Sequence, residues 1–393
     1  MAVLDLDGLM AQGVRGQRVF LRADLNVPLR DGTISDDSRL RASRRTMRRL
    51  MAGGARLIVT SHLGRPKGTR APELTLRPVA PRLAELLDTG VSFCEDCVGE
   101  QATAAASGLD DGQVLLLENL RFHEGETKND PDFARALADL ADVYVNDAFG
   151  TAHRAHASTV GVVEHMSRAA AGDLLKSELN HLRVVLEPER PLLAIIGGAK
   201  VSGKLDVMEA LAPHADVLAL GGAMVYTFLA AQGDPTGDSL VEENLIEDAN
   251  RVVHAARRAG RRLLLPTDHV VAEAIEPGAP TRVVETIPEG WIGVDIGPET
   301  ALTYAEETDR ARTVFWNGPP GIFEIEAFAH GTEILAQAMA KTSATTVVGG
   351  GDSVAAVNQL GVGDLITHCS TGGGASLEYV QGLTLPGVAA LDR

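Results

Sequence analysis

The stretch that decides the fold runs from Thr345 to Val380 and reads TTVVGGGDSVAAVNQLGVGDLITHCSTGGGASLEYV. Twice in this stretch a short apolar run comes shortly before three consecutive glycines, at Gly349–Gly351 and at Gly372–Gly374. Each cluster leads into a predicted helix start, where free backbone N–H groups and the positive end of the helix dipole favour anions. Glycine also lets the backbone approach a ligand closely. The pattern therefore predicts two strand–turn–helix units that bind phosphate.

A carboxylate follows the first glycine cluster directly. Asp352 would repel phosphate groups bound at these glycines unless a cation lay between them. A single glycine cluster is as typical of a tight turn without a ligand. Two clusters together with Asp352 favour a Mg²⁺–nucleotide site, in which Asp352 is the predicted metal ligand.

Length and charge limit the classes of protein that fit. The 393 residues predict two domains, and the net charge of −17 argues against nucleic acid and anionic membranes as partners. Residues 1–190 hold 24 Lys and Arg against 27 Asp and Glu, whereas residues 191–393 hold 12 against 26. The basic side chains are thus concentrated in the first half, and one interpretation is a small anionic ligand held there by arginines. For five of them the spacing indicates instead the solvated outer face of a helix, namely Arg41, Arg44, Arg45, Arg48 and Arg49.

The chain shows no sign of export or membrane insertion. Its first ten residues, MAVLDLDGLM, lack the basic region of a signal peptide, and no apolar run is long enough to span a bilayer. Cys94 and Cys97 form a C-x-x-C pair without the second pair that a zinc site needs, so we expect reduced thiols. These features predict a cytoplasmic protein.

Short apolar runs alternate with amphipathic segments along the chain, which predicts parallel sheets covered by helices on both faces. The predicted strands of the first half are 19–21, 57–60, 114–117 and 143–145, and the predicted helices are 38–52, 75–87, 98–107 and 131–140. The predicted strands of the second half are 192–196, 217–220, 262–265, 292–294, 314–316 and 346–348. The prediction is an α/β protein with two domains, 1–171 and 191–380, a hinge helix over 172–190, and a tail from 381 to 393.

Ligands of open parallel sheets bind beyond the carboxyl ends of the strands. The segments after the four strands of the first half are 22–28, 61–66, 118–124 and 146–156. Each supplies an arginine, namely Arg22, Arg65, Arg121 and Arg154. Four converging guanidinium groups would be costly without an anion, and arginine matches phosphate and carboxylate geometry. Asp24 and Asn26 add partners for a hydroxyl group, so the segments predict a hydroxylated phosphate ester or carboxylate as ligand.

The second half contains a near match to a phosphate-binding loop. Residues 198–205 read GAKVSGKL and fit G-x-x-x-x-G-K-[ST] except at Leu205, which lacks the required hydroxyl. Lys200 and Lys204 are two of only three lysines in residues 191–393. Solvated lysines are the alternative, but two ammonium groups at one helix start favour a shared phosphate.

These segments resemble those of the phosphoglycerate kinase family. The resemblance rests on RADLNVP (22–28), SHLGRP (61–66), ENLRFHEGE (118–126), NDAFGTAHRAHA (146–157), GGAKVSGK (197–204), WNGPPGIFE (316–324), GGGDS (349–353) and STGGGASLE (370–378). It extends from the first predicted strand almost to the C-terminus. It implies two Rossmann-like domains and transfer of a phosphoryl group between 1,3-bisphosphoglycerate and MgADP, giving 3-phosphoglycerate and MgATP.

The resemblance also implies roles for particular residues. The implied phosphoglycerate ligands are Asp24, Leu25, Asn26, Arg39, His62, Leu63, Gly64, Arg65, Arg121 and Arg154. The implied nucleotide ligands are Lys204, Gly293, Asn317, Glu324, Gly350, Gly351, Asp352 and Ser353, with Glu324 on the ribose and Asp352 on Mg²⁺. The groups implied around the transferred phosphoryl are Arg39, Lys200, Lys204, Gly372 and Gly373. The resemblance further implies a monomer that closes over its substrates and a C-terminal tail that returns to the first domain.

Two other functions fit parts of the pattern. A P-loop ATPase would need a hydroxyl at Leu205 and leaves the first-half arginines without a role. A two-lobed anion receptor would not need the carboxylate of Asp352. We therefore expect direct in-line transfer by a kinase, because a loose phosphoryl transition state needs positioning and positive charge more than a covalent nucleophile.

Overall fold

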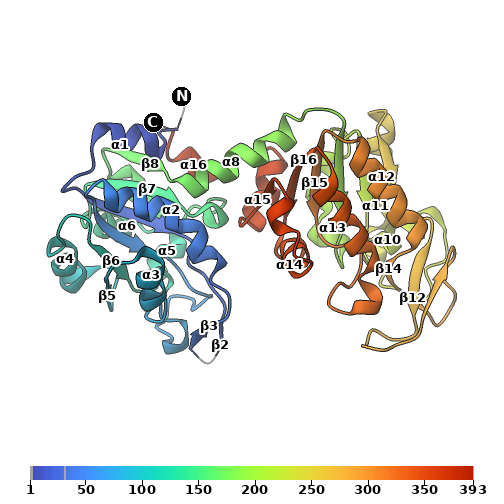
Figure 1. The fold of residues 1–393 in the computed structure, drawn as a ribbon, viewed down its shortest axis with the longest axis horizontal. Coiled ribbons are helices and arrows are strands. Elements are labelled where there is room, and N and C mark those ends of the chain that lie inside the picture. Colours follow the sequence, from blue (N-terminus) through green and yellow to red (C-terminus); the bar gives the residue numbers. More distant parts are fainter. Residues whose placement is uncertain (1–2, 31, 393) are drawn as a thin grey trace. The chain divides into compact units, whose positions relative to one another are not determined.

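The computed structural model describes residues 3–30 and 32–392, and the chain divides into two compact units (Figure 1). The first unit contains the chain up to Leu179 together with the C-terminal residues from Thr384 onward. The second unit contains Asn180–Leu383. Helix α8 (Asp173–Leu186) contains the point of division.

The first unit is built on a parallel sheet of six strands. The strands are β1 (Arg18–Ala23), β4 (Arg56–Thr60), β5 (Val91–Cys94), β6 (Val114–Leu117), β7 (Val143–Asp147) and β8 (Ala169–Ala171). Their order across the sheet is β5-β6-β4-β1-β7-β8, so the chain reverses its direction of winding at β1. All four residues of β6 are buried, as both faces of a covered parallel strand require. The sequence predicted the four central strands and missed β5 and β8 at the two edges.

Helices cover both faces of this sheet. The longer ones are α1 (Leu6–Gln12), α2 (Ser38–Ala52), α3 (Val79–Leu87), α4 (Gly99–Ser107), α5 (Glu124–Lys128) and α6 (Pro131–Ala138). Helix α2 buries Leu40, Met47 and Leu50 against the core, while four of its arginines are exposed, namely Arg41, Arg44, Arg45 and Arg48. Arg41 pairs there with Asp37 at 2.8 Å, which agrees with the interpretation of this arginine as a residue of the outer helix surface.

The second unit repeats the architecture. Its parallel strands are β9 (Leu192–Ile196), β10 (Val217–Leu220), β11 (Arg262–Leu264), β15 (Thr313–Asn317), β16 (Thr345–Gly349) and β17 (His368–Cys369). The order β11-β10-β9-β15-β16-β17 is that of a doubly wound nucleotide-binding sheet. Its helices are α9 (Leu205–Leu211), α10 (Val225–Gln232), α11 (Ile246–Arg258), α12 (Pro298–Arg310), α13 (His330–Lys341), α14 (Gly351–Gln359) and α15 (Gly374–Val380). The prediction of two Rossmann-like α/β units is confirmed.

One predicted strand belongs to a different sheet. Residues 292–294 lie in β14 (Ile292–Ile296), which pairs antiparallel with β12 (His269–Ala272). Strand β13 (Thr281–Val284) completes this three-stranded sheet. The prediction that 292–294 continue the parallel series is wrong, because a short apolar run fits either kind of sheet.

The C-terminal residues contact the first unit. Helix α16 (Pro386–Ala389) lies against the loop after β7, where the Gly387 N–H donates to the Ala152 carbonyl at 2.8 Å. Asn146 Nδ2 donates in turn to the Gly387 carbonyl at 3.2 Å. The C-terminal helix thereby stabilises the loop after β7, which also contains Arg154.

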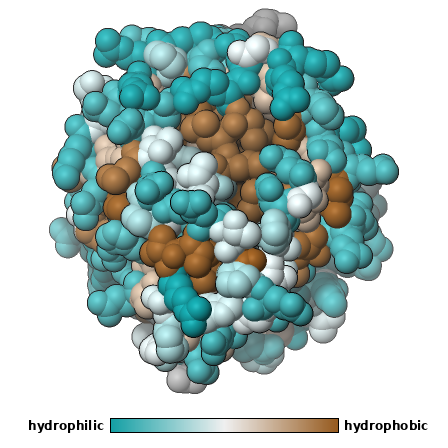
Figure 2. All heavy atoms as spheres, turned by 90° about the vertical axis from the view of Figure 1, so that its right-hand side faces the viewer, coloured by the Kyte–Doolittle hydropathy of each residue, from teal (hydrophilic) through white to brown (hydrophobic). Residues whose placement is uncertain are grey.

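Apolar side chains also reach the surface in the second unit. Figure 2 shows several apolar patches on one face of the molecule, separated by polar residues. Exposed large apolar residues of this unit include Leu240, Ile275, Val283 and Leu302. Among the residues that the structure describes, no helix has both the length and the apolar character needed to cross a membrane.

Candidate active site

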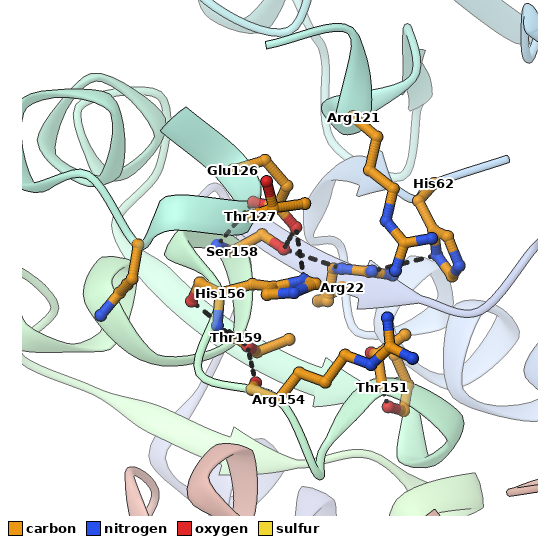
Figure 3. Close-up of polar contacts among 12 residues, drawn as sticks. Arg22, His62, Arg121, Glu126, Thr127, Thr151, Arg154, His156, Ser158 and Thr159 are labelled. Atoms are coloured by element: carbon orange, nitrogen blue, oxygen red, sulfur yellow. Dashed lines mark hydrogen bonds and ion pairs between the residues drawn. The ribbon is translucent and has the colours of Figure 1, made fainter. Parts of the chain in front are cut away.

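The carboxyl ends of β1, β4, β6 and β7 bring the polar residues of the first unit together (Figure 3). Arg39 from the first turn of α2 reaches the end of β1, where its Nη1 lies 2.6 Å from Asp24 Oδ2. The Asp24 side chain is 9% exposed and that of Arg39 is 34% exposed. Arg39 is therefore anchored by one nitrogen while its guanidinium group remains open to solvent.

Arg121 is buried, and its side chain donates to a backbone carbonyl. Its Nη1 donates to the Gly64 carbonyl at 2.9 Å, and the Gly64 N–H donates to Asn26 Oδ1 at 2.9 Å. The buried Nε of Arg121 has no hydrogen-bond partner. Burial, together with the charges of Arg22 and Arg154, lowers the pKa of Arg121 to about 10. Burial of a cation with an unused donor is costly without a partner, so this arrangement favours the binding of an anion.

Arg22 lies in the arginine cluster, as its place at a strand end predicted. It lies within β1 and is completely buried, so it is not open to a ligand as the converging arginines were expected to be. Its guanidinium group bonds to the Ala23 carbonyl, to Ser158 Oγ at 2.9 Å and to His62 Nδ1 at 3.2 Å. Arg22 thus contacts other protein groups from inside the cluster.

The remaining predicted ligands of the first unit fall into two groups. Arg65 and Arg154 are exposed, and Arg154 Nε donates to His153 Nε2 at 3.1 Å. The side chains of Leu25 and Leu63 are buried, and their N–H groups donate to Ser61 Oγ and Asn119 Oδ1. For these two leucines only backbone atoms could meet a ligand.

Sequence reasoning missed a buried acid beneath the cluster. Glu126 is fully buried and accepts two hydrogen bonds from Ser158. His156 Nδ1 lies 3.7 Å from Glu126 Oε1. Burial and the charges of Arg121, Arg22 and Arg154 lower the pKa of His156 to about 4. The quoted segments ENLRFHEGE and NDAFGTAHRAHA contain Glu126 and His156, but only the folded contacts show why they matter.

A cavity of about 340 Å³ lies in the second unit, within the range of small-ligand sites. Three predicted nucleotide residues line it, namely Gly293, Glu324 and Asp352. Its apolar wall comes from four separate segments, of which only the one with Ile322 and Phe323 lies in a quoted motif: Leu240, Ile275, Ile292, Val294, Ile322 and Phe323. A flat apolar wall beside acidic groups suits a base and ribose.

Close approaches of other atoms explain a glycine that lines this cavity, Gly293, and one beside it, Gly197. A Cβ on Gly293 would lie 1.9 Å from the Tyr226 hydroxyl oxygen. A Cβ on Gly197, which follows β9, would lie 2.4 Å from the Gly318 carbonyl oxygen, which follows β15. The two central strands of the sheet therefore end in contact, at the point where the strand order reverses.

Lys204 and Asn317 also meet at this point. Lys204 Nζ donates to Asn317 Oδ1, while the buried Asn317 Nδ2 has no partner. Burial lowers the pKa of Lys204, and the charge of Asp352 opposes this shift. Gly349 and Gly350 pass close to Asn317, since a Cβ on either glycine would lie 3.1 Å from Asn317 Nδ2. An unpaired amide donor next to a lysine fits a phosphate oxygen.

The first glycine cluster forms the predicted strand–turn–helix unit. Gly350 has φ of 88°, a conformation that favours glycine, and α14 begins at Gly351. Asp352 is exposed in the first turn, whereas Ser353 is buried and accepts the Gly318 N–H at 2.6 Å. Ser353 thus ties this turn to the loop after β15, and its hydroxyl oxygen is already bonded.

The second cluster and Lys200 have different settings. Gly372 is buried and donates its N–H to Ser370 Oγ at 3.2 Å, and Gly373 precedes the short helix α15 with φ of 52°. Lys200 is exposed before the turn that leads to Lys204. Its side chain is free to move toward a ligand.

The donor set at Asp352 fits a magnesium ion held partly by phosphate. Among the described residues, the one group of three ligating side chains that lies within 4.8 Å is Asp96, Cys97 and His123 in the first unit. There His123 Nε2 lies 2.7 Å from Asp96 Oδ1, and burial raises the pKa of the Cys97 thiol. Mg²⁺ commonly uses one or two carboxylates with substrate phosphates, so a single exposed carboxylate at a phosphate turn is a suitable ligand.

Comparison with known proteins gives the family. The family model described as phosphoglycerate kinase matches residues 9–383. The chain is 51% identical to phosphoglycerate kinase of Trichodesmium erythraeum over 98% of both chains, and 54% identical to that of Moorella thermoacetica over 97% of both. The solved structure of phosphoglycerate kinase from Coxiella burnetii superposes with a TM-score of 0.90 at 39% identity, covering 100% of this chain and 99% of that one.

The match covers both units, including the arginine cluster and the glycine-lined cavity. The activity of this family is the transfer of a phosphoryl group between a small phosphorylated acid and a nucleotide. The chain belongs to the phosphoglycerate kinase family, and its reaction is the reversible transfer of the acyl phosphate of 1,3-bisphosphoglycerate to ADP.

Proposed function

We propose that the first unit binds 3-phosphoglycerate or 1,3-bisphosphoglycerate and that the second unit binds the magnesium complex of ADP or ATP. The observation that carries this proposal is the separation of charge between the two sites. The first has buried and half-buried arginines with unused donors, and the second has an apolar cavity with acidic groups at its edge.

The first site suits an acid that bears both a phosphate and a hydroxyl group. Arg65, Arg121 and Arg154 supply guanidinium groups for the phosphate, and His62 with Gly64 lies beside them. Asp24 and Asn26 lie at the end of β1 as partners for the hydroxyl group. Backbone atoms of Leu25 and Leu63 complete the wall.

The second site suits a nucleotide. Glu324 lines the cavity as the partner for ribose hydroxyls, and Gly293 lines the wall proposed for the base, with Tyr226 packed against it. Lys204, Asn317 and the turn Gly350–Gly351–Asp352–Ser353 lie where the phosphates would bind. Asp352 would hold Mg²⁺, which when bound neutralises phosphate charge and orients the transferring group.

The transfer itself requires positive charge and alignment. Arg39 offers a guanidinium group anchored on Asp24, and Lys200 and Lys204 offer ammonium groups on the nucleotide side. The N–H groups around Gly372 and Gly373 are further donors toward the phosphoryl oxygens. Because the two ligands are assigned to different units, transfer requires a closing motion, for which α8 is the proposed hinge. Closure would also exclude the water that hydrolyses an acyl phosphate.

We further propose a monomeric enzyme of the cytoplasm that binds neither nucleic acid nor membranes. The net charge of −17 supports the absence of polyanionic partners. One relative, from Triticum aestivum, is named as cytosolic and is 51% identical over 97% of this chain. Other relatives are named as chloroplastic, so the compartment itself is a proposal.

A crossed binding experiment tests the assignment of the two ligands. Arg154→Ala and Glu324→Ala are titrated with 3-phosphoglycerate and with MgADP by calorimetry. We expect Arg154→Ala to weaken only 3-phosphoglycerate binding and Glu324→Ala to weaken only MgADP binding, each by about tenfold, the value of one good polar contact. The assignment would be overturned if Arg154→Ala weakened only MgADP binding or Glu324→Ala weakened only 3-phosphoglycerate binding. It would also be overturned if each variant lost both ligands while its melting temperature stayed unchanged.

A further inference from the structure

The buried carboxylate of Glu126 accepts hydrogen bonds from Ser158 through both of its oxygens, and His156 lies beside it. Glu126 Oε1 accepts the Ser158 hydroxyl at 2.6 Å, and Oε2 accepts the Ser158 N–H at 3.0 Å (Figure 3). Both residues are 0% exposed. A buried charge is costly unless its lone pairs are satisfied, and this bidentate contact satisfies one on each oxygen.

The contact fixes the direction of the Ser158 hydroxyl. A hydroxyl group has one proton, and a carboxylate can only accept, so this proton points to Glu126. A lone pair of Ser158 Oγ then faces Arg22 Nε, which donates at 2.9 Å. Glu126 thereby makes Ser158 a ready acceptor for Arg22.

Arg22, held by Ser158, in turn fixes which nitrogen of His62 carries the proton. Its Nη2 lies 3.2 Å from His62 Nδ1, and a guanidinium group has donors only. His62 Nδ1 must therefore accept, which places the ring proton on Nε2. Burial, followed by the charges of Arg22, Arg121 and Arg39, lowers the pKa of His62 well below its ordinary value, so the ring stays neutral.

We infer that Glu126 and Ser158 are positioning residues for His62. Acting through Arg22, they hold the imidazole with Nδ1 as acceptor and Nε2–H as donor, ready for an oxygen of the anionic substrate. The inference rests on the proposed role of the first unit as the phosphoglycerate site. It gives the fully buried Arg22 a task that direct ligand contact cannot give it.

The local structure is suited to this task. Arg22 lies in β1, His62 follows β4, and Ser158 lies in the helical segment Ala157–Gly161. Each link is a buried hydrogen bond between elements of one unit. The Tyr144 hydroxyl also donates to the Ser158 carbonyl at 2.9 Å, which holds this segment against β7.

The test uses two variants and a matched control. Ser158→Ala removes the acceptor for Arg22. Glu126→Gln keeps the shape but sets an amide N–H₂ against one of the two donors of Ser158, so the hydroxyl must reorient. Glu124→Gln is the control, because Glu124 lies in the same short helix, is exposed and pairs with Lys128.

Two readouts are needed. Nitrogen-15 NMR of the imidazole nitrogens reports the His62 tautomer, with the signal assigned by its loss in His62→Gln. Calorimetry reports binding of 3-phosphoglycerate and, separately, of MgADP. We expect a single Nε2–H tautomer in the wild type and in Glu124→Gln, and a mixture of tautomers in Ser158→Ala and in Glu126→Gln. We expect 3-phosphoglycerate binding to weaken about tenfold in Ser158→Ala and less in Glu126→Gln, with MgADP binding unchanged.

The outcomes separate the two levels of the account. A wild-type His62 that is protonated on Nδ1, or a tautomer and affinity unaffected in both variants, would overturn the inference while leaving the substrate site in place. If the folded wild type failed to bind 3-phosphoglycerate at all, the proposed site would fail, and the inference with it. Should Ser158→Ala not fold, Glu126→Gln decides alone through the same tautomer signal.

Discussion

Arg39 Nη1 lies 2.6 Å from Asp24 Oδ2, so an arginine assigned to the transferred phosphoryl is anchored on a carboxylate assigned to the substrate hydroxyl. The pair fixes the direction of the guanidinium group but uses only part of its five N–H donors. The remaining donors can serve developing charge on the phosphoryl oxygens without a large rearrangement.

Arg39→Ala should therefore lower kcat far more than it changes nucleotide affinity. Removal of one preorganised donor to a charged transition state costs about 10²–10³ in kcat. Steady-state kinetics with MgATP and 3-phosphoglycerate measure the effect. Arg41→Ala is the matched control, since Arg41 is exposed on the same helix and pairs with Asp37. A near-normal kcat in Arg39→Ala would remove Arg39 from the transfer step.

Asp352→Asn should weaken binding of MgADP while leaving binding of metal-free ADP nearly unchanged. The substitution removes the negative charge of the proposed metal ligand and keeps its shape. We expect about tenfold weaker MgADP binding, within the range of a lost charged contact. Calorimetric titrations with and without Mg²⁺ measure the difference. Asp364→Asn, an exposed acid of the same unit, is the control. Equal MgADP affinity in Asp352→Asn and wild type would contradict the metal assignment.

Gly293→Ala should damage the nucleotide cavity by overpacking. The new Cβ would lie 1.9 Å from the hydroxyl oxygen of Tyr226, which is buried and cannot swing into solvent. Forced overpacking costs about 1–3 kcal/mol, so both the unfolding free energy and ADP affinity should fall. Chemical denaturation and ADP titration measure the two losses.

Gly203→Ala provides the contrast for this prediction, because a Cβ there has no heavy atom within 4 Å. It should leave cavity and stability unchanged. Wild-type ADP affinity in Gly293→Ala would show that Gly293 does not shape the nucleotide site.

Acid should destabilise the first unit through His156. Burial and the neighbouring arginines hold its folded pKa at about 4, below the unfolded value of about 6.5. Between these values the unfolded chain binds more protons, so stability is lost as pH falls from about 6.5 to 4. The loss is at most about 3 kcal/mol by linkage.

The measurement for this prediction is the unfolding free energy across that pH range in wild type and His156→Gln. The substitution should make the dependence shallower without abolishing it, because burial also lowers the pKa of His62. His254→Gln, on the exposed face of α11, should leave it as in the wild type. An identical pH dependence in His156→Gln and wild type would show that His156 is not the titrating group.

Much of the fold could be predicted from the sequence because the central strands are continuous apolar runs. Strand β8 (Ala169–Ala171) escaped because three alanines look no different from a helix, and β5 (Val91–Cys94) because a serine interrupts it. The apolar run at Ile292 correctly predicted a strand but assigned it to the wrong sheet, because the partners of a strand are set by contacts with residues distant in the chain.

The candidate site divides in the same way. Residues in compact motifs, such as Asp352 and Lys204, could be placed on the correct turns from spacing alone. Most of the apolar cavity wall could not, because Leu240, Ile275 and Ile292 come from three separate segments outside the motifs. The sequence also could not show that Arg22 is buried. An arginine at a strand end has the same sequence pattern whether its guanidinium group binds a ligand or, as here, Ser158.

The most direct measurement is turnover in a coupled assay. Purified protein receives 3-phosphoglycerate, ATP and Mg²⁺, and glyceraldehyde-3-phosphate dehydrogenase with NADH reports the 1,3-bisphosphoglycerate formed. The account predicts robust turnover that requires Mg²⁺ and collapses in Arg39→Ala but not in Arg41→Ala. A folded protein that binds nucleotide yet shows no turnover with 3-phosphoglycerate would contradict it.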